Sequence, residues 1–523
     1  MWKEQIMHVL FATSEVAPYS KTGGLGDVCG ALPKALVRLG CKVSVVTPYY
    51  KSVADYFQRT GEPCESLYGV TLSAPVGNKT IRAGVIKATV SGVDFYFIEH
   101  NDYFNREGLY NYQGIDYEDN HERFSFFSQA ALELVTALDL DVNVVHAHDW
   151  QTGLVPVYLD AVYKSRSKFD VSSGFGNSVR PQFDNTADRA QKFDDIKSVI
   201  TIHNLRHQGR FWRGAMDVTG LDWSYFTYDK MEFFGQLNFL KSGIVFSDMI
   251  TTVSPKYAQE IQTEEFGERL QGVLQLRSPS LRGILNGIDI DEWNPATDKY
   301  IAANYDLETF EIGKPKCKAA LQQELGLNQD PNTPLLGVVS RFDPQKGLDL
   351  IADCAAELIE HEGVQFAILG SGDETLGSRF HMLSKRYPQS FALRNEFSIG
   401  MSHKIEAGAD LFLMPSRYEP CGLNQMYSLR YGTLPLVHDV GGLHDTVVNA
   451  SDENIANGTG NGFVFYWENV DDMRRALNWA LYVYRCRKDD WKSIIRTAMS
   501  SDLSWEKSAR EYLNLYEEMT AEN

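Results

Sequence analysis

Short apolar runs, many of them rich in β-branched residues, alternate with stretches of helical periodicity along almost the whole chain. The runs are MHVLFATSEV (7–16), CKVSVVTPYY (41–50), VDFYFIEH (93–100), VNVVHAHDW (142–150), SVITIHN (198–204) and DMITTVS (248–254), then TPLLGVVSR (333–341), VQFAILGSG (364–372), ADLFLMPS (409–416) and TLPLVHDV (433–440). Continuous apolar strands, each bounded by a loop and followed by a helix, are typical of parallel sheets covered on both faces. The pattern therefore predicts an α/β protein with two doubly wound, Rossmann-like parallel-sheet domains.

The domain boundary is predicted from an interruption in this pattern. A chain of 523 residues exceeds what one hydrophobic core usually supports. The segment GILNGIDIDEWNP (283–295) breaks the periodicity between the two series of strands and helices. The predicted domains are residues 1–284 and 285–503, followed by a C-terminal helical segment at 504–523. Because ligands of such sheets bind beyond the carboxyl ends of the strands, polar residues that follow the strands are the candidates for function.

Composition and charge indicate which classes of binding partner are disfavoured and which cellular compartment fits the chain. The net charge of -19 repels polyanions, which argues against a nucleic-acid-binding surface or an anionic membrane surface. An anionic ligand would therefore need a local group of Lys and Arg side chains. No apolar stretch reaches the roughly 18 residues of a membrane span, and the amino terminus has no features of a leader. Seven cysteines without a CxxC pair fit a reducing compartment, so the chain is predicted to be cytoplasmic.

The stretch KTGGLGDV (21–28) follows the first predicted strand and is rich in glycine. Gly23, Gly24 and Gly26 can adopt positive φ and let another molecule approach the backbone, with Lys21 as a positive charge beside them. Amides at the start of the next predicted helix would offer donors to an anion. The spacing fits neither the dinucleotide-binding fingerprint nor the P-loop. On its own, this stretch is compatible with a ligand-binding loop or with a plain tight turn.

Four further motifs occur in a fixed order after this loop: HAHDW (146–150), TIHN (201–204), SRFDPQKGLDL (340–350) and SRYEPCGLNQMYSLRYGTLPLV (416–437). Together with KTGGLGDV they closely resemble the bacterial glycogen synthase and plant starch synthase family, and the resemblance spans nearly the whole chain. It implies a GT-B fold with the active site in the interdomain cleft, and a last helix that crosses back to the first domain. It also implies retaining transfer of glucose from ADP-glucose to the non-reducing end of an α-1,4-glucan.

Two cations are predicted to stabilise the departing diphosphate. Arg341 and Lys346 lie five residues apart, after an apolar strand and just before a predicted helix. Fixed positive charge near a helix N-terminus would hold both phosphates. No Asp-x-Asp metal motif lies at a persuasive strand end, so we expect neither a metal nor any other cofactor such as pyridoxal phosphate. The alternative for these two residues is a pair of solvated surface charges.

The motif EPCGLNQ supplies the candidates for binding the donor glucose. Glu419 can accept hydrogen bonds from sugar hydroxyls, and the backbone of Cys421, Gly422 and Leu423 is predicted to open a helix. The resemblance implies that this glutamate and these amides bind the donor glucose. Cys421 lies between Pro and Gly without an obvious His partner, so it is not predicted to be a nucleophile.

The resemblance implies roles for five further residues. His203 would be positional, with its carbonyl near the developing oxocarbenium and its ring on the sugar, while the leaving phosphate takes the acceptor's proton. Asp149 and Asn204 would bind sugar hydroxyls, and Asp27 would contact the nucleotide sugar. Phe397 would stack on the adenine, where the family often has Tyr. Open alternatives are a buried histidine in a strand-end turn for His203, a helix cap for Asp27 and core packing for Phe397.

Two segments allow more than one interpretation. The tract 103–127, which begins with Tyr103, mixes Tyr with Asp, Asn and Gly. It predicts either an acceptor-glucan surface or an Ω-loop packed by its own aromatic rings. Residues 164–195 are polar and aperiodic, which indicates a surface insertion. This insertion is either a tolerated loop or a contact with glucan or a partner.

The expected ligands are a nucleotide-sugar donor and a glucan acceptor, with no nucleic acid and no membrane. The rival functions are a glucan phosphorylase-like enzyme of the same fold and a non-catalytic glucan-binding protein. A phosphorylase would need a Lys that holds pyridoxal phosphate, and a binding protein would be expected to lose donor-site residues. The sequence leaves open the preference for ADP-glucose over UDP-glucose, the polymer and the oligomeric state.

Overall fold

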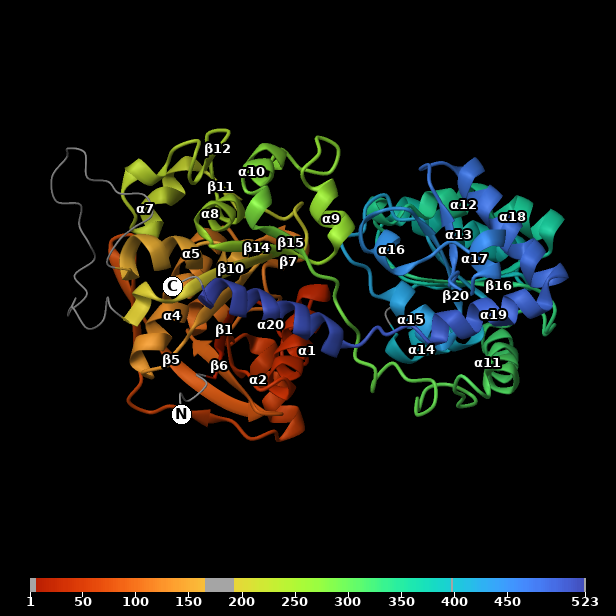
Figure 1. Ribbon diagram of the computed structural model, residues 1–523, viewed down its shortest axis with the longest axis horizontal. Coiled ribbons are helices and arrows are strands. Elements are labelled where there is room, and N and C mark those ends of the chain that lie inside the picture. The colour runs from red at the N-terminus through yellow and green to blue at the C-terminus, as the bar shows by residue number, and fades with distance from the viewer. Residues whose placement is uncertain (1–5, 165–191, 397, 522–523) are drawn as a thin grey trace. The chain divides into compact units, whose positions relative to one another are not determined.

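A computed structural model describes residues 6–164, 192–396 and 398–521. Phe397 and most of the predicted insertion therefore lie outside the described residues. The described chain forms two compact units (Figure 1). Unit 1 comprises residues within 1–253, 258–286 and 505–523, and unit 2 comprises 254–257 and 287–504. No helix among the residues described is long and apolar enough to cross a membrane.

Unit 1 is built on a ten-stranded sheet whose central part is parallel. The strand order is β15 (Leu281–Gly283), β14 (Met249–Thr252), β10 (Lys197–Ile202), β9 (Val144–His148), β1 (His8–Ala12), β2 (Lys42–Pro48), β6 (Val93–Glu99), β5 (Lys79–Val90) and β3 (Glu65–Ser66), with β4 (Leu72–Val76) paired to β5. The chain leaves β1 toward β2 and returns to the other side of β1 at β9. The strand order therefore reverses at β1, where doubly wound sheets bind ligands.

The edge beyond β6 differs from the expected parallel pattern. Strand β5 pairs antiparallel with β6, β4 and β3, so this edge is a meander rather than a series of crossovers. Its buried residues, Ala83, Val85, Ile86 and Ala88, fall on both faces of the strand, and the other residues of β5 are partly or fully exposed. Two small antiparallel sheets complete the strands described in unit 1: β11 (Arg210–Phe211) with β13 (Gln236–Asn238) and β12 (Glu232–Phe233), and β7 (Asn111–Tyr112) with β8 (Ile115–Asp116).

The helices of unit 1 cover its sheet and include the end of the chain. They are α1 (Gly24–Arg38), α2 (Lys51–Thr60), α3 (Asn101–Phe104), α4 (Asn120–Ala137), α5 (Val155–Tyr158), α7 (Met216–Thr219), α8 (Phe239–Phe246), α9 (Pro255–Glu260, partly assigned to unit 2), α10 (Gln271–Leu276) and α20 (Trp505–Ala521). Figure 1 shows α20, in dark blue, lying with α1 and β1, and α20 packs directly on α1. Its Tyr516 hydroxyl bonds to His146 Nδ1 at 2.8 Å. The last helix thus belongs to the same core as the first strand.

Unit 2 contains a six-stranded, fully parallel sheet. Its order is β18 (Phe391–Arg394), β17 (Gln365–Leu369), β16 (Leu335–Val339), β19 (Leu411–Met414), β20 (Leu434–His438) and β21 (Phe463–Phe465). Its helices are α11 (Phe310–Leu325), α12 (Leu348–Glu362), α13 (Glu374–Arg386), α14 (Ile399–Gly408), α15 (Asn424–Tyr431), α16 (Gly441–Thr446), α17 (Asp452–Ala456), α18 (Val470–Cys486) and α19 (Lys488–Met499). The predicted class, two doubly wound α/β domains, is confirmed.

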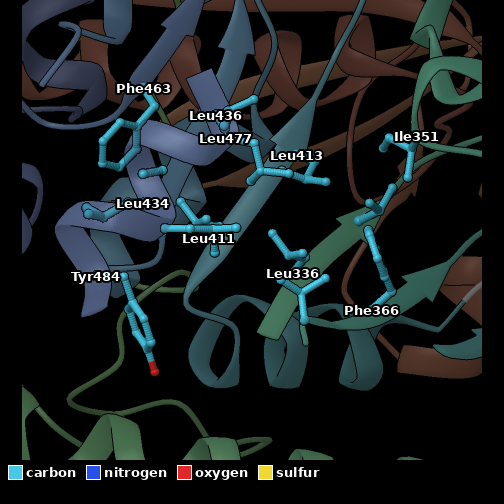
Figure 2. Close-up of a cluster of buried hydrophobic side chains, with 14 of the residues drawn as sticks. Leu336, Ile351, Phe366, Leu411, Leu413, Leu434, Leu436, Phe463, Leu477 and Tyr484 are labelled. Carbon is cyan, nitrogen blue, oxygen red and sulfur yellow. The ribbon is translucent and has the colours of Figure 1, made fainter. Parts of the chain in front are cut away.

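The core of unit 2 is formed by the apolar runs that predicted its strands. Figure 2 shows Leu336, Phe366, Leu411 and Leu434 from the sheet together with Ile351 from α12. Each of these side chains is at most 1% exposed. Because both faces of the strands are buried, the interior of each strand is apolar, and polar residues such as Gln365, Arg394 and His438 lie at strand ends. In this sheet the order reverses between β16 and β19, so the loops after these two strands are where a ligand is expected.

Candidate functional site

The Gly-rich stretch of unit 1 is the start of a helix rather than a loop of positive φ. Helix α1 begins at Gly24 and Gly23 is its N-cap, with an extended backbone at φ -158°. None of the three glycines has positive φ, so that part of the interpretation is wrong. A Cβ added at Gly23 or Gly24 would meet no described atom within 4 Å, whereas one at Gly26 would lie 3.1 Å from the Lys21 side chain. The backbone at the first two positions is therefore open to an approaching molecule.

Glu15 fixes this helix start, and sequence reasoning missed it. Glu15 is 3% exposed, and its carboxylate accepts hydrogen bonds from Thr22 N at 2.5 Å, Thr22 Oγ1 at 2.6 Å and Gly23 N at 3.2 Å. The Tyr110 hydroxyl donates to it at 2.7 Å. Two of the amides expected to bind an anion are thus already used within the protein. The next two amides, of α1 itself, donate to no acceptor within the described part of the chain and stay available.

Lys21 and Asp27 form an ion pair at this helix start. The distance from Lys21 Nζ to Asp27 Oδ1 is 2.7 Å, and the two side chains are 50% and 29% exposed. Asp27 lies in the first turn of α1 but makes no capping hydrogen bond, so the alternative of a helix cap is wrong. Burial raises the pKa of Asp27, and the ammonium group of Lys21 opposes that rise. Lys21 therefore carries a half-exposed positive charge that an anionic ligand could share.

Asp149 and His203 meet where β9 and β10 end. Asp149 is 8% exposed, has a positive φ of 57°, and its Oδ1 accepts the backbone N–H of His203 at 2.8 Å. Burial raises the pKa of Asp149 to about 7, while the backbone N–H groups of His203 and Asn204 act in the opposite direction. Asn204 Oδ1 accepts the N–H of Arg206 at 3.1 Å. Through this hydrogen bond to the backbone of His203, the side chain of Asp149 connects the ends of the neighbouring strands β9 and β10.

His203 is the first in a row of three histidines, and the other two, His148 and His146, were not predicted. His203 Nε2 lies 3.0 Å from His148 Nδ1, and the rings of His148 and His146 are 4.2 Å apart. His146 bonds through Nε2 to Thr201 Oγ1 at 2.6 Å. Burial lowers the pKa of His146 and of His203 to about 3. His203 is therefore neutral at pH 7. This fits a group that contacts the substrate and does not act as an acid from the imidazolium form.

Tyr103 does not present its ring to solvent. It is 6% exposed, packs near His100 and Phe126, and donates its hydroxyl to Glu122. At this position the structure favours the packed loop over a platform for sugar rings. Further along the same tract, Tyr112 in β7 is 52% exposed.

In unit 2, the predicted cations and the predicted glutamate gather at the reversal of strand order. The loop after β16 carries Arg341 and the single 3₁₀ turn Pro344–Lys346, and the loop after β19 carries Glu419. A cavity of about 190 Å³ lies between these loops, and its lining includes Arg341, Lys346, Ser416, Glu419, Gly422 and Leu423. Topology alone places these side chains at one edge of the sheet, so their proximity is independent of any family resemblance.

Lys346 and Glu419 are in direct contact. Lys346 Nζ donates to Glu419 Oε2 at 2.6 Å, and the Ser416 hydroxyl donates to the same oxygen at 3.0 Å. The lysine side chain is 21% exposed and the glutamate side chain 8% exposed. Arg341, in contrast, is exposed, and its guanidinium makes no hydrogen bond or ion pair with the residues that the structure describes. Two positive charges therefore line the cavity: that of Lys346, which the carboxylate of Glu419 holds in place, and that of Arg341, which a ligand could bind.

The start of α15 adds backbone donors to this cavity. Leu423 is the N-cap of α15, and Gly422 has a φ of 72°. The N–H groups of Gly422 and Leu423 donate to no acceptor among the residues described. Cys421 is buried, and its carbonyl accepts from Gln425 Nε2 at 3.0 Å. Gly422 and Leu423, two of the three residues whose amides were predicted to bind the donor, therefore line the cavity, and Cys421 is not among its lining residues.

Comparison with known proteins adds independent information. The family model for the starch synthase catalytic domain matches residues 8–174 and 183–276, and the model for glycosyl transferases group 1 matches residues 320–489. A glycogen synthase of Pseudothermotoga lettingae is 43% identical over 514 residues, covering 98% of this chain and 99% of the relative. One of Koribacter versatilis is 43% identical over 512 residues, covering 98% of each chain.

A solved structure is similar over the whole chain. The catalytic domain of starch synthase IV from Arabidopsis thaliana, bound to ADP and acarbose, has a TM-score of 0.83 and 32% sequence identity, and the match covers 99% of both chains.

Proposed function

The chain belongs to the glycogen synthase and starch synthase family of glycosyltransferases, and from that premise we propose that it uses ADP-glucose as donor. The resemblance stated from the motifs and the GT-B fold class are confirmed. The proposed reaction adds glucose to the non-reducing end of an α-1,4-glucan with retention at the anomeric carbon. The relatives are named glycogen synthases, which favours this function over a phosphorylase-like enzyme or a non-catalytic glucan-binding protein.

One observation carries the proposal: Arg341, Lys346 and Glu419 line one cavity at the strand reversal of unit 2. When the anomeric C–O bond breaks, the electron pair leaves with the diphosphate, so negative charge develops on its oxygens. A fixed lysine and an available arginine can stabilise that charge without reorganising. The new bond forms from an acceptor hydroxyl oxygen to the anomeric carbon on the same face, and the hydroxyl proton passes to the departing phosphate oxygen.

The remaining groups fit binding of the sugar. Glu419 has a carboxylate that can accept hydrogen bonds from glucose hydroxyls, and Gly422 and Leu423, whose N–H groups donate to no acceptor among the described residues, line the same cavity. His203 is neutral, so we propose a positional role for it and for Asp149 rather than a transfer of protons. Lys21 would contact the anionic donor.

The choice of ADP-glucose rests on likeness rather than on a residue of this chain. The similar starch synthase was solved with ADP, and we propose the same nucleotide here. Independence of metal and of pyridoxal phosphate stays a prediction, as does a cytoplasmic location.

The test is release of nucleotide by the pure protein with glycogen and either ADP-glucose or UDP-glucose, each with and without EDTA. We expect ADP release that survives EDTA and a slower reaction with UDP-glucose. Release from UDP-glucose alone would overturn the choice of donor. Loss of the activity in EDTA would overturn metal independence, and no release from either donor would overturn the proposed function.

A further inference from the structure

Arg417 connects the two loops of unit 2 that carry Lys346 and Glu419. Its backbone N–H donates to the carbonyl of Gln345 at 2.8 Å, and its Nη1 donates to the carbonyl of Pro344 at 2.5 Å. Both acceptors belong to the 3₁₀ turn that ends at Lys346. Arg417 lies two residues before Glu419, in the loop after β19, so it fastens one loop to the other.

The guanidinium also holds the first turn of α12. Its Nη1 and Nη2 donate to the two carboxylate oxygens of Asp349 at 2.9 and 2.8 Å, and its Nε donates to Glu468 Oε1 at 2.6 Å. Asp349 lies next to the helix N-terminus, where negative charge is favoured. A bidentate pair fixes direction as well as distance. The turn, the helix and the loop after β19 are therefore aligned by one side chain.

Neighbouring contacts repeat the connection on both sides of Lys346. Gln345 Nε2 donates to the carbonyl of Tyr418 at 3.0 Å. Gly347 has a φ of 61°, and a Cβ added there would lie 2.0 Å from the carbonyl oxygen of Pro415. The backbone before and after Lys346 is thus held against the loop after β19. The ammonium group of Lys346 makes a further contact with the same loop through its ion pair with Glu419.

We propose that Arg417 is a positioning residue for glucosyl transfer, which fixes Lys346 at the place where charge develops on the leaving diphosphate. This inference rests on the proposed function. Every guanidinium nitrogen of Arg417 donates to a protein acceptor. Its effect is therefore exerted through Lys346 and not on the ligand. A preorganised charge stabilises a transition state only when its distance is fixed, and displacements of about 1 Å can cost roughly 100-fold in rate.

The test is a double-mutant cycle in steady-state kinetics. Arg417→Met keeps an unbranched side chain and removes the four hydrogen bonds of the guanidinium. We expect kcat to fall by about 10- to 100-fold with a smaller change in the KM for ADP-glucose. In a Lys346→Ala background, the same substitution should lower kcat by less than about threefold, because the two residues act through one contact. Arg417→Lys keeps the charge without the bidentate pair and should give an intermediate kcat.

Arg474 is the matched control. Its Nη1 contacts both carboxylate oxygens of Glu357 at 2.9 and 2.8 Å, its Nη2 contacts Asp471, and it is 35% exposed against 30% for Arg417. It also reaches α12, but far from the cavity-lining loops in sequence. Arg474→Met should leave kcat within about twofold of the wild type.

A second readout separates this inference from the proposed function. Amide exchange of the full chain without ligand should be faster at residues 345–347 in Arg417→Met than in Arg474→Met or the wild type. Unchanged exchange there, or an equal loss of kcat with and without Lys346, would overturn the positioning role. If the wild type transfers glucose from neither donor, the proposed function fails, while exchange still decides whether Arg417 holds the turn.

Discussion

Gly347 is the position where a single added methyl group should separate the two loops of unit 2. It ends the 3₁₀ turn that carries Lys346 and is the N-cap of α12, with φ 61° and ψ 20°. In Gly347→Ala, the new Cβ would lie 2.0 Å from the carbonyl oxygen of Pro415 and 3.0 Å from its carbonyl carbon. The obstacle is backbone, so a rotamer change cannot relieve it.

The size of the effect follows from that distance. Non-bonded carbon and oxygen atoms need a separation of at least about 3 Å, so one loop must move by roughly 1 Å. The contact between Lys346 Nζ and Glu419 Oε2 is 2.6 Å. A shift of this size lengthens it to about 3.6 Å, which is no longer a hydrogen bond. A misplacement of about 1 Å in a catalytic group can cost roughly 100-fold in rate, so we expect kcat of Gly347→Ala to fall by about that factor.

Gly363 provides a matched control at the other end of α12. Its φ of 59° is almost the same, but a Cβ added there meets no described atom within 4 Å. Gly363→Ala therefore introduces the left-handed strain of about 1 kcal/mol without the clash. We expect its kcat to equal that of the wild type and its Tm to fall by about 2–4 °C.

The assay is the initial rate of ADP release at saturating ADP-glucose and glycogen, together with thermal unfolding of each variant. A kcat for Gly347→Ala within about threefold of the wild type would refute the reasoning. So would equal losses in both glycine variants, since strain without a clash would then explain the effect.

Three further predictions concern single side chains. Changing Arg341 or Lys346 to Ala should lower kcat by roughly 100-fold with a smaller change in donor KM, and near-normal turnover with only a raised KM would contradict the electrostatic role. Glu15→Gln should lower kcat/KM by about 10-fold and speed amide exchange at residues 21–24, because an amide NH₂, which donates, replaces one carboxylate oxygen, which accepts. Unchanged exchange would contradict the anchoring role of Glu15. His146 has a pKa lowered to about 3, so the unfolded state binds more protons below about pH 6.5 and stability falls as pH falls. His146→Gln should flatten the pH dependence of unfolding by about 1.4 kcal/mol per pH unit between about pH 5 and 6, measured by denaturation at several pH values, and an unchanged slope would contradict a neutral buried ring.

The fold could be predicted where strands are buried on both faces. Runs such as those at 335–339 and 411–414 are apolar throughout because neither face meets water. The antiparallel edge with β5 was not predicted, since charged and polar residues interrupt its sequence KTIRAGVIKATV and leave no long continuous apolar run. Strand β18 (FALR), at the edge of its sheet, has only three consecutive apolar residues before Arg394, too few for a distinct apolar run.

The cavity-lining residues could be predicted because topology gathers strand ends at one edge. Lys346 and Glu419 lie 73 positions apart in the chain and still meet, since β16 and β19 are neighbours. The anchoring residues, Arg417 for the turn of Lys346 and Glu15 for the start of α1, gave no such signal. Arg417 reaches Asp349 across 68 positions, and Glu15 reaches Tyr110 across 95. Such contacts depend on the folded geometry of loops, which periodicity does not encode.

Residue type alone was misleading at two positions. The glycines of KTGGLGDV indicated positive φ, but Gly23 and Gly24 instead leave the backbone uncovered at a helix start. Tyr103 lies in a tract that is rich in both aromatic and polar residues, and composition does not tell which ring is buried. In both cases the folded structure decided the outcome: the missing side chains leave backbone uncovered at the helix start, and neighbouring residues bury the ring of Tyr103.

The most direct test of the central claim is the structure of the product. The wild type is incubated with maltoheptaose and ADP-glucose that carries a ¹³C label at the anomeric carbon, and the new linkage is followed by NMR. We predict one ADP released for each labelled α-1,4 linkage at the non-reducing end. A β-linkage would contradict retention, and ADP release with the label recovered only as glucose or glucose 1-phosphate would contradict transfer to a glucan.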